Sequence, residues 1–415
     1  MPAGAGAPLR VLFLADRLSA RGGADRHLLG IVKRLQAKAH TLLAVGHDDG
    51  SLPGAERAEL GAWRRVKGLE RGGLGRRGGE AARRRLGELL ASWRPQVVHL
   101  QNVMDPALLE LAAAGGRALL TVQDHRFFCP GLGKLTARGE PCRRVMGEHC
   151  LGCFEDRDYG RRLLELTRRR LLAAAGMARV LVLSQYMAQE LERAWAEMGI
   201  PAPPLSVLPP WVDGLDLEPE ALRPPGECGY HLLAGRLVAR KGVRVALEAA
   251  RRLERPLPLW VAGDGPLAGE VERAARSGGG RVRFLGWQDR RGMARLLAGA
   301  RSLWLPSLWA EPFGLVGLEA LWLGRPVVAS AVGGVEQWLR PKENGLVVPP
   351  GEAGALAAAA DRLAAEAALA DRLGRQGRRD AAAFAPAGLM ARLWDHYRRV
   401  ASPRDRGGRK KGPGA

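Results

Sequence analysis

The sequence predicts an α/β protein with two domains, of which the first opens like a doubly wound sheet, and three observations lead to this prediction. Short apolar runs typical of buried parallel strands alternate with amphipathic segments typical of helices. The length of 415 residues is enough for two domains that each bury a full core. Prolines cluster and the periodicity is lost between residues 201 and 225, which indicates a boundary between the two domains.

The composition is that of a globular protein with an affinity for anions. Apolar residues make up 47% of the chain and charged residues 26%, while the formal net charge is +21. Such a charge attracts nucleotides and anionic membrane surfaces. The arginine-rich stretches 64–85 and 161–170 are the candidate membrane-facing segments. We expect no nucleic-acid partner, because no recognition motif or aromatic platform accompanies the charge.

The expected location is the cytoplasm, with any membrane contact peripheral and at the inner membrane face. The first eight residues lack the charged start and the apolar run of a signal peptide. Charged residues interrupt every apolar stretch, and none approaches the ~20 residues that a membrane span requires.

The first domain opens with the apolar run LRVLFLA at residues 9–15, which predicts a buried strand. Gly22 and Gly23 follow it and precede an amphipathic helix that ends near Leu35. In a doubly wound fold, a glycine turn at this place lets the backbone approach a phosphate group closely. A purely structural turn is the alternative.

Two further strands are expected at residues 96–101 and 118–122, and each delivers polar side chains at its C-terminal end. His99 lies near the end of the first strand, and Asp124 follows the second. Open α/β sheets bind ligands at this edge, so both residues are candidates for substrate contact. A hydrogen-bonded core histidine is the equal alternative for His99.

Four of the five cysteines fall within 25 residues, at Cys129, Cys142, Cys150 and Cys153. Their spacing, which ends in CLGC, predicts a closed structural zinc site. Free thiols, disulfides and an iron–sulfur cluster are the alternatives, although a reducing cytoplasm disfavours disulfides. Cys228 stands alone.

The most informative segment is RSLWLPSLWAEPFGLVGLEALWLGR at residues 301–325. It predicts a short strand, a loop that carries Glu311, and a helix over residues 313–323. The orphan amide groups and the dipole at a helix N-terminus suit a phosphate. Phosphates repel carboxylates, so Glu311 and Glu319 are expected to accept hydrogen bonds from hydroxyls instead. A diphosphate between two polyhydroxylated rings is a nucleotide sugar; the alternative is a surface helix with solvated glutamates.

Within this segment, EPFGLVGLEAL resembles the donor-site motif of the retaining family-4 glycosyltransferases. These enzymes have two Rossmann-like domains with a donor cleft between them, the GT-B architecture. The resemblance extends from about residue 11 to about residue 400. It implies that Arg236 and Lys241, in the GR…KG motif, grip the donor diphosphate and that Glu311 holds hydroxyls of the sugar. These three are the expected catalytic residues. An arginine can bind phosphate oxygens bidentately, and a lysine adds a point charge.

The resemblance also implies a set of substrate-binding residues around this centre. The GGADR turn faces the donor phosphate and the acceptor, the GDGP turn ends a strand of the second domain, and the segment FLGW lies against the base. Glu319 would hold the ribose hydroxyls. The full set is Gly22, Gly23, His99, Asp124, Gly263, Gly265, Trp287, Phe313, Gly314, Leu315 and Glu319.

The implied function is transfer of a hexosyl group from a nucleoside-diphosphate sugar to a glycan, lipid-linked or small-molecule acceptor. Configuration would be retained, and no metal or other cofactor would take part in catalysis, which consists chiefly of stabilising charge on the leaving diphosphate. In TVQDHRFFCP, however, Gln123 replaces the histidine that usually lies against the donor sugar, and His125 follows two positions later. The alternative is therefore a catalytically weak partner subunit that binds nucleotide sugars.

The expected domain organisation follows from these assignments. Residues 1–210 form the acceptor-side domain, with a cysteine-rich insertion at 125–155, and residues 211–385 form the nucleotide-sugar-binding domain. Residues 386–401 resemble the C-terminal helix of the family, which packs back on the first domain. Residues 402–415 are a basic tail that we expect to be disordered.

Overall fold

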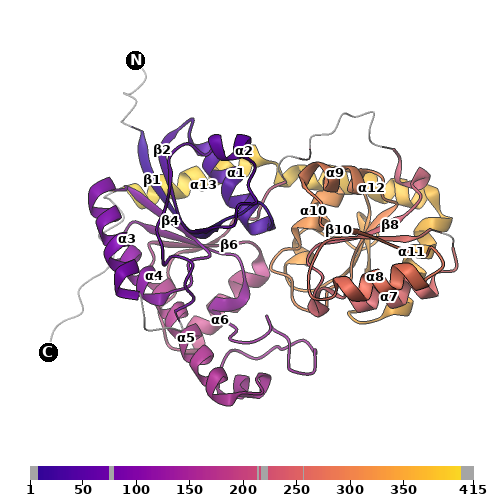
Figure 1. Cartoon of the computed structure of the whole chain (residues 1–415), viewed down its shortest axis with the longest axis horizontal. Helices are drawn as coiled ribbons and strands as arrows, with labels where there is room; N and C mark the ends of the chain where they lie inside the picture. The colour runs from indigo at the N-terminus through magenta and orange to yellow at the C-terminus, as the bar shows by residue number, and fades with distance from the viewer. Residues whose placement is uncertain (1–7, 74–78, 213–214, 216–222, 256, 403–415) are drawn as a thin grey trace.

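Two parallel sheets form the framework of the protein (Figure 1). The structure is a computed structural model that describes residues 8–73, 79–212, 215, 223–255 and 257–402. The first sheet has the strand order β3-β2-β1-β4-β5-β6-β7, and all neighbouring strands run parallel. Its strands are β1 (Leu9–Leu18), β2 (Ala39–Asp48), β3 (Trp63–Arg65), β4 (Val97–Gln101), β5 (Ala118–Val122), β6 (Arg179–Val182) and β7 (Leu205–Val207).

The second sheet repeats this topology with six strands, in the order β10-β9-β8-β11-β12-β13. Its strands are β8 (His231–Ala234), β9 (Leu259–Ala262), β10 (Val282–Gly286), β11 (Ser302–Leu305), β12 (Val327–Ser330) and β13 (Gly345–Val348). In each sheet the chain order reverses once, between β1 and β4 and between β8 and β11. Doubly wound sheets bind ligands beside this reversal, at the carboxyl ends of the strands. The predicted fold class is confirmed.

Helices cover the sheets, and polar side chains cap the starts of several of them. Asp105, Asp156 and Ser184 each accept a hydrogen bond from a backbone amide in the first turn of the helix that follows, which fixes where α4, α5 and α6 begin. The helices of the first half are α1 (Gly23–Leu35), α2 (Gly54–Ala58), α3 (Gly79–Trp93), α4 (Pro106–Ala113), α5 (Arg157–Ala175) and α6 (Gln185–Glu197). Those of the second half are α7 (Val243–Arg252), α8 (Ala268–Ser277), α9 (Arg290–Ala298), α10 (Leu315–Trp322), α11 (Ala353–Ala365) and α12 (Ala367–Ala381).

The last helix, α13 (Pro386–Ala401), returns to the first sheet, as its yellow ribbon beside β1 and β4 shows (Figure 1). Leu389, Leu393 and Tyr397 on this helix belong to the same buried cluster as Val11 and Phe13 of β1. Burial of these large apolar side chains stabilises the packing of α13, near the end of the chain, against β1, near its beginning.

No helix among the described residues is long and apolar enough to cross a membrane. Apart from Ser402, the expected basic tail lies outside the described residues. So do residues 213–214 and 216–222, next to the expected domain boundary, and residues 74–78 within the first arginine-rich stretch.

Candidate active site

A buried ion pair lies at the strand ends of the second sheet, beside the reversal of strand order. Lys241 ends a 3₁₀ turn after β8 (Ala239–Lys241), and Glu311 lies in the loop after β11. The Lys241 Nζ donates hydrogen bonds to both carboxylate oxygens of Glu311, at 2.7 and 2.8 Å. Ser307 Oγ donates to the same carboxylate. Glu311 is only 2% exposed, whereas the side chain of Lys241 is 28% exposed and faces solvent in part.

The environment keeps the Glu311 carboxylate ionised despite its burial. Burial on its own would raise the pKa of Glu311, since a charged group loses its hydration. The charge of Lys241 and the hydrogen bonds from Lys241 and Ser307 outweigh this effect and hold the pKa below its ordinary value. The pair therefore presents a fixed negative group next to a partly accessible cation.

Gly242 explains why Lys241 can approach the end of β11. It adopts a left-handed backbone conformation with φ of 73°, and a Cβ atom there would lie 1.8 Å from the carbonyl oxygen of Pro306. A side chain would thus force apart the turn after β8 and the end of β11. The Lys241–Glu311 contact therefore requires that a glycine follow Lys241.

The helix that follows Glu311 is α10, and its N-terminus is open. It begins at Leu315 after Gly314, which is left-handed with φ of 79°, and no side chain of a described residue caps it. The expected start at residue 313 is wrong by two residues, because Phe313 is still in the loop: its ring is buried, and its carbonyl oxygen accepts a hydrogen bond from Trp338 Nε1 at 2.7 Å. The first amide groups of α10 are available for an anionic ligand.

The first domain contacts this loop directly. A Cβ atom at Gly23, at the start of α1, would lie 3.3 Å from the side chain of Leu315. Ser184 Oγ donates to the carbonyl oxygen of Pro312 at 2.8 Å, and the amide of Gln185 donates to the side chain of Gln337 at 3.1 Å. Gly23 and the N-terminus of α10 therefore lie together between the two domains. Gly22 is the N-cap of α1, one residue earlier.

Arg236 lies in the turn after β8, which packs against the turn after β9. A Cβ atom at Gly263 would lie 1.9 Å from the carbonyl oxygen of Gly235, and one at Gly265 would lie 2.6 Å from that of Leu237. These glycines thus serve close packing of the two turns. The Arg236 side chain is exposed, and among the described residues no hydrogen bond or ion pair holds it, so it can meet an anionic ligand.

Glu319 and Trp287 lie apart from the ion pair. Glu319 is buried on α10 and forms an ion pair with Arg290, at the start of α9. Trp287 follows β10 and is 49% exposed, an unusual degree for an indole that packs in a core. Glu319 is thus a buried carboxylate that is already paired with a cation, and Trp287 presents an exposed aromatic face.

His99 does not reach the site. Its side chain is fully buried, and its ring nitrogens lie 2.6 Å from Tyr397 Oη and 2.7 Å from Thr121 Oγ1. Both nitrogens are therefore engaged, which favours the alternative that the sequence left open, a hydrogen-bonded core histidine. His99 links α13 to β4 and β5.

Burial lowers the pKa of His99 from 6.5 to about 3, which gives a testable dependence on pH. The unfolded chain takes up a proton first as the pH falls, so the contribution of His99 to stability is complete above pH 6.5 and is lost below it. Between about pH 6 and pH 4, we expect His99→Gln to lose stability less steeply than the wild type, by about 1.4 kcal/mol per pH unit. Urea unfolding at several pH values measures these slopes. The exposed His40→Gln is the control, and equal slopes for all three proteins would contradict the assignment.

Asp124 and Gln123 are engaged within the first domain. The carboxylate of Asp124 caps the 3₁₀ turn His125–Phe127 and pairs with Arg126. Burial raises and Arg126 lowers the pKa of Asp124, and the net effect is a lower value than usual. Gln123 Nε2 donates to Gln101 Oε1 at 3.1 Å. The expected contact of Asp124 with substrate therefore has to compete with its contacts to Arg126.

Two aromatic groups that the sequence did not single out as site residues lie next to the ion pair. The ring of His125 is buried, with its centroid 4.9 Å from that of Trp309, two residues before Glu311. Both ring nitrogens of His125 lack a hydrogen-bond partner among the described residues, and burial lowers its pKa to about 4. Arg240 lies over the Trp309 ring at 4.6 Å. His125 is thus a neutral polar group that the first domain presents to the loop of Glu311.

The cysteine-rich segment folds back on itself without closing a metal site. The amide of Lys134 donates to Cys129 Sγ at 3.3 Å, and the amide of Cys142 donates to the carbonyl oxygen of Lys134 at 2.8 Å. Burial and the neighbouring thiols raise the pKa of Cys150 and of Cys153. The four sulfurs share one neighbourhood, yet no group of three or more ligands among the described residues is placed to hold a metal ion.

Two protein families match the chain, one in each half. The family described as Glycosyltransferase Family 4 matches residues 21–214. The family described as Glycosyl transferases group 1 matches residues 230–366. Together these regions contain every strand of both sheets except β1.

Curated relatives are similar over part of their length. The lipopolysaccharide core biosynthesis glycosyltransferase LpsE of Rhizobium meliloti (strain 1021) is 36% identical over 155 residues, which are 37% of this chain and 44% of that protein. The alpha-D-kanosaminyltransferase of Streptomyces kanamyceticus is 33% identical over 147 residues, 34% of this chain and 38% of that protein. The matched regions thus span less than half the length of these relatives.

Solved structures match almost the whole chain. Anabaena Alr3699/HepE, in complex with UDP and glucose, superposes with a TM-score of 0.68 at 18% identity, over 94% of this chain and 100% of that one. A glycosyltransferase from Rickettsia africae ESF-5 gives a TM-score of 0.69 at 16% identity, over 96% and 100% of the two chains. At such identities the likeness establishes the fold.

Proposed function

The chain belongs to the glycosyltransferases of family 4 and group 1, with their two Rossmann-like domains, and on that premise we propose its reaction. It transfers a hexosyl group from a nucleoside-diphosphate sugar to a glycan, lipid-linked or small-molecule acceptor, with retention and without a catalytic metal. The observation that carries this proposal is the Lys241–Glu311 pair, which lies beside the open N-terminus of α10 at the reversal of strand order.

The leaving group is the nucleoside diphosphate, so the enzyme must stabilise the charge that develops on it. Arg236 and Lys241 supply positive side chains, and the amides of Gly314, Leu315 and the next residue supply oriented dipoles. Lys241 has three N–H donors, of which Glu311 engages two. One donor therefore remains for a phosphate oxygen. Loss of one such group typically costs about 3–4 kcal/mol of transition-state stabilisation.

Glu311 has a different part in this reaction. It is held in place by Lys241 and Ser307, and it stays ionised. We assign it to the sugar of the donor, where its carboxylate accepts hydrogen bonds from hydroxyls and stabilises positive charge on the ring. Retention then follows from attack by the acceptor on the face that the diphosphate leaves.

The remaining assignments place the nucleoside along α10. Glu319 would accept hydrogen bonds from the ribose after exchange of its partner Arg290, and the exposed ring of Trp287 would lie against the base. The chain's similarity to HepE, which was solved with UDP, makes UDP the first nucleotide to try.

The substitution at Gln123 motivates a second candidate, a partner subunit that binds nucleotide sugars but transfers them poorly. In the structure the polar ring of His125 lies against Trp309, near the loop of Glu311. This arrangement favours an enzyme over a partner subunit, because the first domain still places a polar side chain beside that loop.

A panel of UDP-, GDP- and ADP-sugars tests the proposed function by thermal unfolding of the purified chain. A donor at 100 times its Kd should stabilise the wild type by about 2.7 kcal/mol. Arg236→Ala should lose much of this effect, whereas the control Arg273→Ala, an exposed residue of α8, should keep it. If no nucleotide sugar or free diphosphate stabilises the wild type, the proposed function is wrong.

We also propose that the four cysteines hold a structural zinc ion, which requires their thiols to draw closer than in the present arrangement. Elemental analysis of protein purified without chelator should find about one equivalent of zinc. Cys150→Ser should lose the metal and lower the melting temperature, while Cys228→Ser should retain it. If the metal-free wild type melts at the same temperature as the protein as purified, the zinc proposal is wrong and the thiols are free.

The location in the cytoplasm, with contact to an anionic membrane surface, is part of the same proposal. Its support is the net charge of +21 and the exposed arginines of α5, Arg161, Arg162 and Arg169. Arg170 of the same run is buried and donates to the carbonyl oxygens of Met104 and Gly72, so it takes no part. We expect the protein to sediment with anionic vesicles and salt to weaken this binding. Equal sedimentation of the protein with neutral and anionic vesicles would contradict the proposal.

A further inference from the structure

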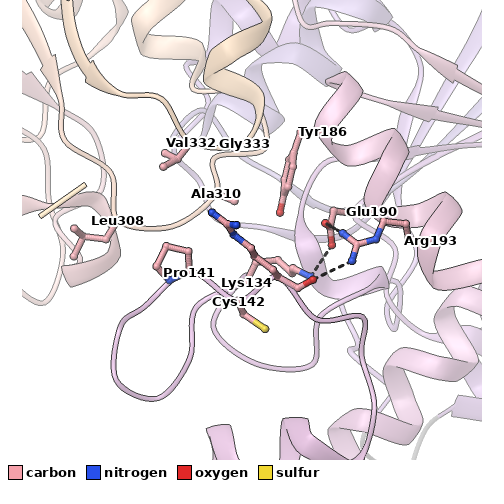
Figure 2. Close-up of a pocket in the computed structure, with 11 residues that line it drawn as sticks. Lys134, Pro141, Cys142, Tyr186, Glu190, Arg193, Leu308, Ala310, Val332 and Gly333 are labelled. Atoms are coloured by element: carbon pink, nitrogen blue, oxygen red, sulfur yellow. Dashed lines mark hydrogen bonds and ion pairs between the residues drawn. The ribbon is translucent and has the colours of Figure 1, made fainter. Parts of the chain in front are cut away.

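A pocket of about 380 Å³ lies between the two domains, next to the loop of Glu311 (Figure 2). The cysteine-rich segment and α6 form its wall on the first domain, and the loops after β11 and β12 form the opposite wall. Two of its lining residues adjoin Glu311: Ala310 precedes it in the chain, and Gly333 pairs with it in a parallel β-bridge. The volume is in the range of small-molecule sites. The pocket therefore lies where an acceptor could approach the donor sugar.

The charged side chains of this pocket are mostly positive. Glu190 lies between Lys134 and Arg193 and pairs with both, at 2.7 and 3.0 Å (Figure 2). Arg143 is a third cation on the lining, and its side chain forms no hydrogen bond or ion pair within the described part of the chain. Three cations face one carboxylate, so the lining keeps a positive excess. An anionic group would complete this arrangement.

The pocket also contains a polar group without a partner. The hydroxyl group of Tyr186, on α6, is buried and has no hydrogen-bond partner among the described residues. Its ring centroid lies 6.0 Å from that of His125, whose two nitrogens likewise lack partners. Buried polar atoms are rarely left unsatisfied, since each costs about 1–3 kcal/mol. A ligand with hydroxyl groups would satisfy the Tyr186 hydroxyl.

We propose that this pocket holds the acceptor, and that the acceptor is a sugar that carries a phosphate group. Arg143 binds the phosphate, for which an arginine provides a planar pair of donors, and Tyr186 bonds to a hydroxyl of the sugar. The Lys134–Glu190–Arg193 network holds the wall in place, because Arg193 also donates to the carbonyl oxygen of Arg143 at 3.0 Å. This inference rests on the proposed function and names the acceptor class of the same site.

Calorimetry on the full chain tests the inference with the donor site already occupied. The protein is first saturated with the nucleoside diphosphate that the donor panel selects, so that Arg236 and Lys241 are engaged. Glucose 1-phosphate, glucose 6-phosphate and glucose are then titrated. We expect at least one sugar phosphate to bind at least tenfold more tightly than glucose. Binding of the 1-phosphate indicates an acceptor phosphorylated at the anomeric carbon, as in lipid-linked sugars, and binding of the 6-phosphate indicates a phosphate elsewhere on a glycan.

Single substitutions locate that binding. Arg143→Ala should weaken the sugar phosphate roughly tenfold and leave glucose unchanged, because it removes one charge-assisted contact. Tyr186→Phe should weaken the sugar phosphate severalfold. Arg138→Ala is the matched control, since it removes an exposed arginine of the same segment that does not line the pocket. If the diphosphate binds but sugar phosphates bind no better than glucose, or bind Arg143→Ala as well as the wild type, the inference is wrong and the proposed function stands. If the diphosphate itself does not bind, the proposed function fails.

Discussion

Glu311→Gln should lower turnover of the nucleotide sugar by about 10²- to 10³-fold while free nucleoside diphosphate still binds. The amide has nearly the same size as the carboxylate, so the loop and its contact with Ser307 can persist. What is lost is the negative charge that interacts with the sugar as the ring becomes cationic, an interaction made mainly in the transition state. Lys241 is also released from its partner, so affinity for the free diphosphate should be equal or higher. Calorimetry of the diphosphate beside turnover of the donor measures both effects.

The control for this experiment is Glu336→Gln, which changes an exposed glutamate of the neighbouring loop. It should leave turnover and diphosphate binding as in the wild type. Near-normal turnover of Glu311→Gln would mean that Glu311 only positions Lys241. A loss of diphosphate binding as large as the loss of turnover would mean that the loop had lost its fold.

Lys241→Met should destabilise the fold by about 3 kcal/mol at pH 7, in addition to weakening the diphosphate. The substitution leaves the carboxylate of Glu311 buried at 2% exposure without its cation, and breaking one side of a buried pair costs about 3–5 kcal/mol. The lower value is expected here because Lys241 is partly exposed. The free energy of unfolding in urea measures the effect.

The double variant Lys241→Met, Glu311→Gln separates the charge from the packing. It should recover most of the lost stability, because no uncompensated charge remains, yet it should stay inactive. Additive losses in the double variant would contradict a direct coupling between the two residues. A Lys241→Met variant as stable as the wild type would contradict the burial of an ionised Glu311.

The local structure around the proposed donor site could be predicted from the sequence, because the residues concerned are close together in short motifs. The loop with Glu311 follows a strand and precedes a helix, as expected, although the helix starts at Leu315 after the left-handed Gly314. The pairing of Lys241 with Glu311 could not be predicted. The two residues are 70 positions apart, and only the adjacency of β8 and β11 brings them together.

The first-domain side of the candidate site was harder to predict for a physical reason. A polar residue near the end of a buried strand faces either the ligand edge or the core, and the sequence does not distinguish these for His99. In the structure α13 covers that face, and Tyr397 engages the ring. His125 lies against Trp309 of the second domain, and the 3₁₀ turn that carries it is capped by Asp124. The sequence held one signal for this turn, because an aspartate can cap the backbone amide two residues after it.

The most direct test of the central claim is proton NMR of a nucleotide sugar incubated with the purified wild type. We expect slow release of nucleoside diphosphate, with the freed sugar appearing first in the anomeric configuration of the donor, and no release above background with Glu311→Gln. A nucleotide sugar that binds with the expected affinity but stays intact in the presence of wild type and of the sugar phosphates would contradict the enzyme and favour the partner subunit.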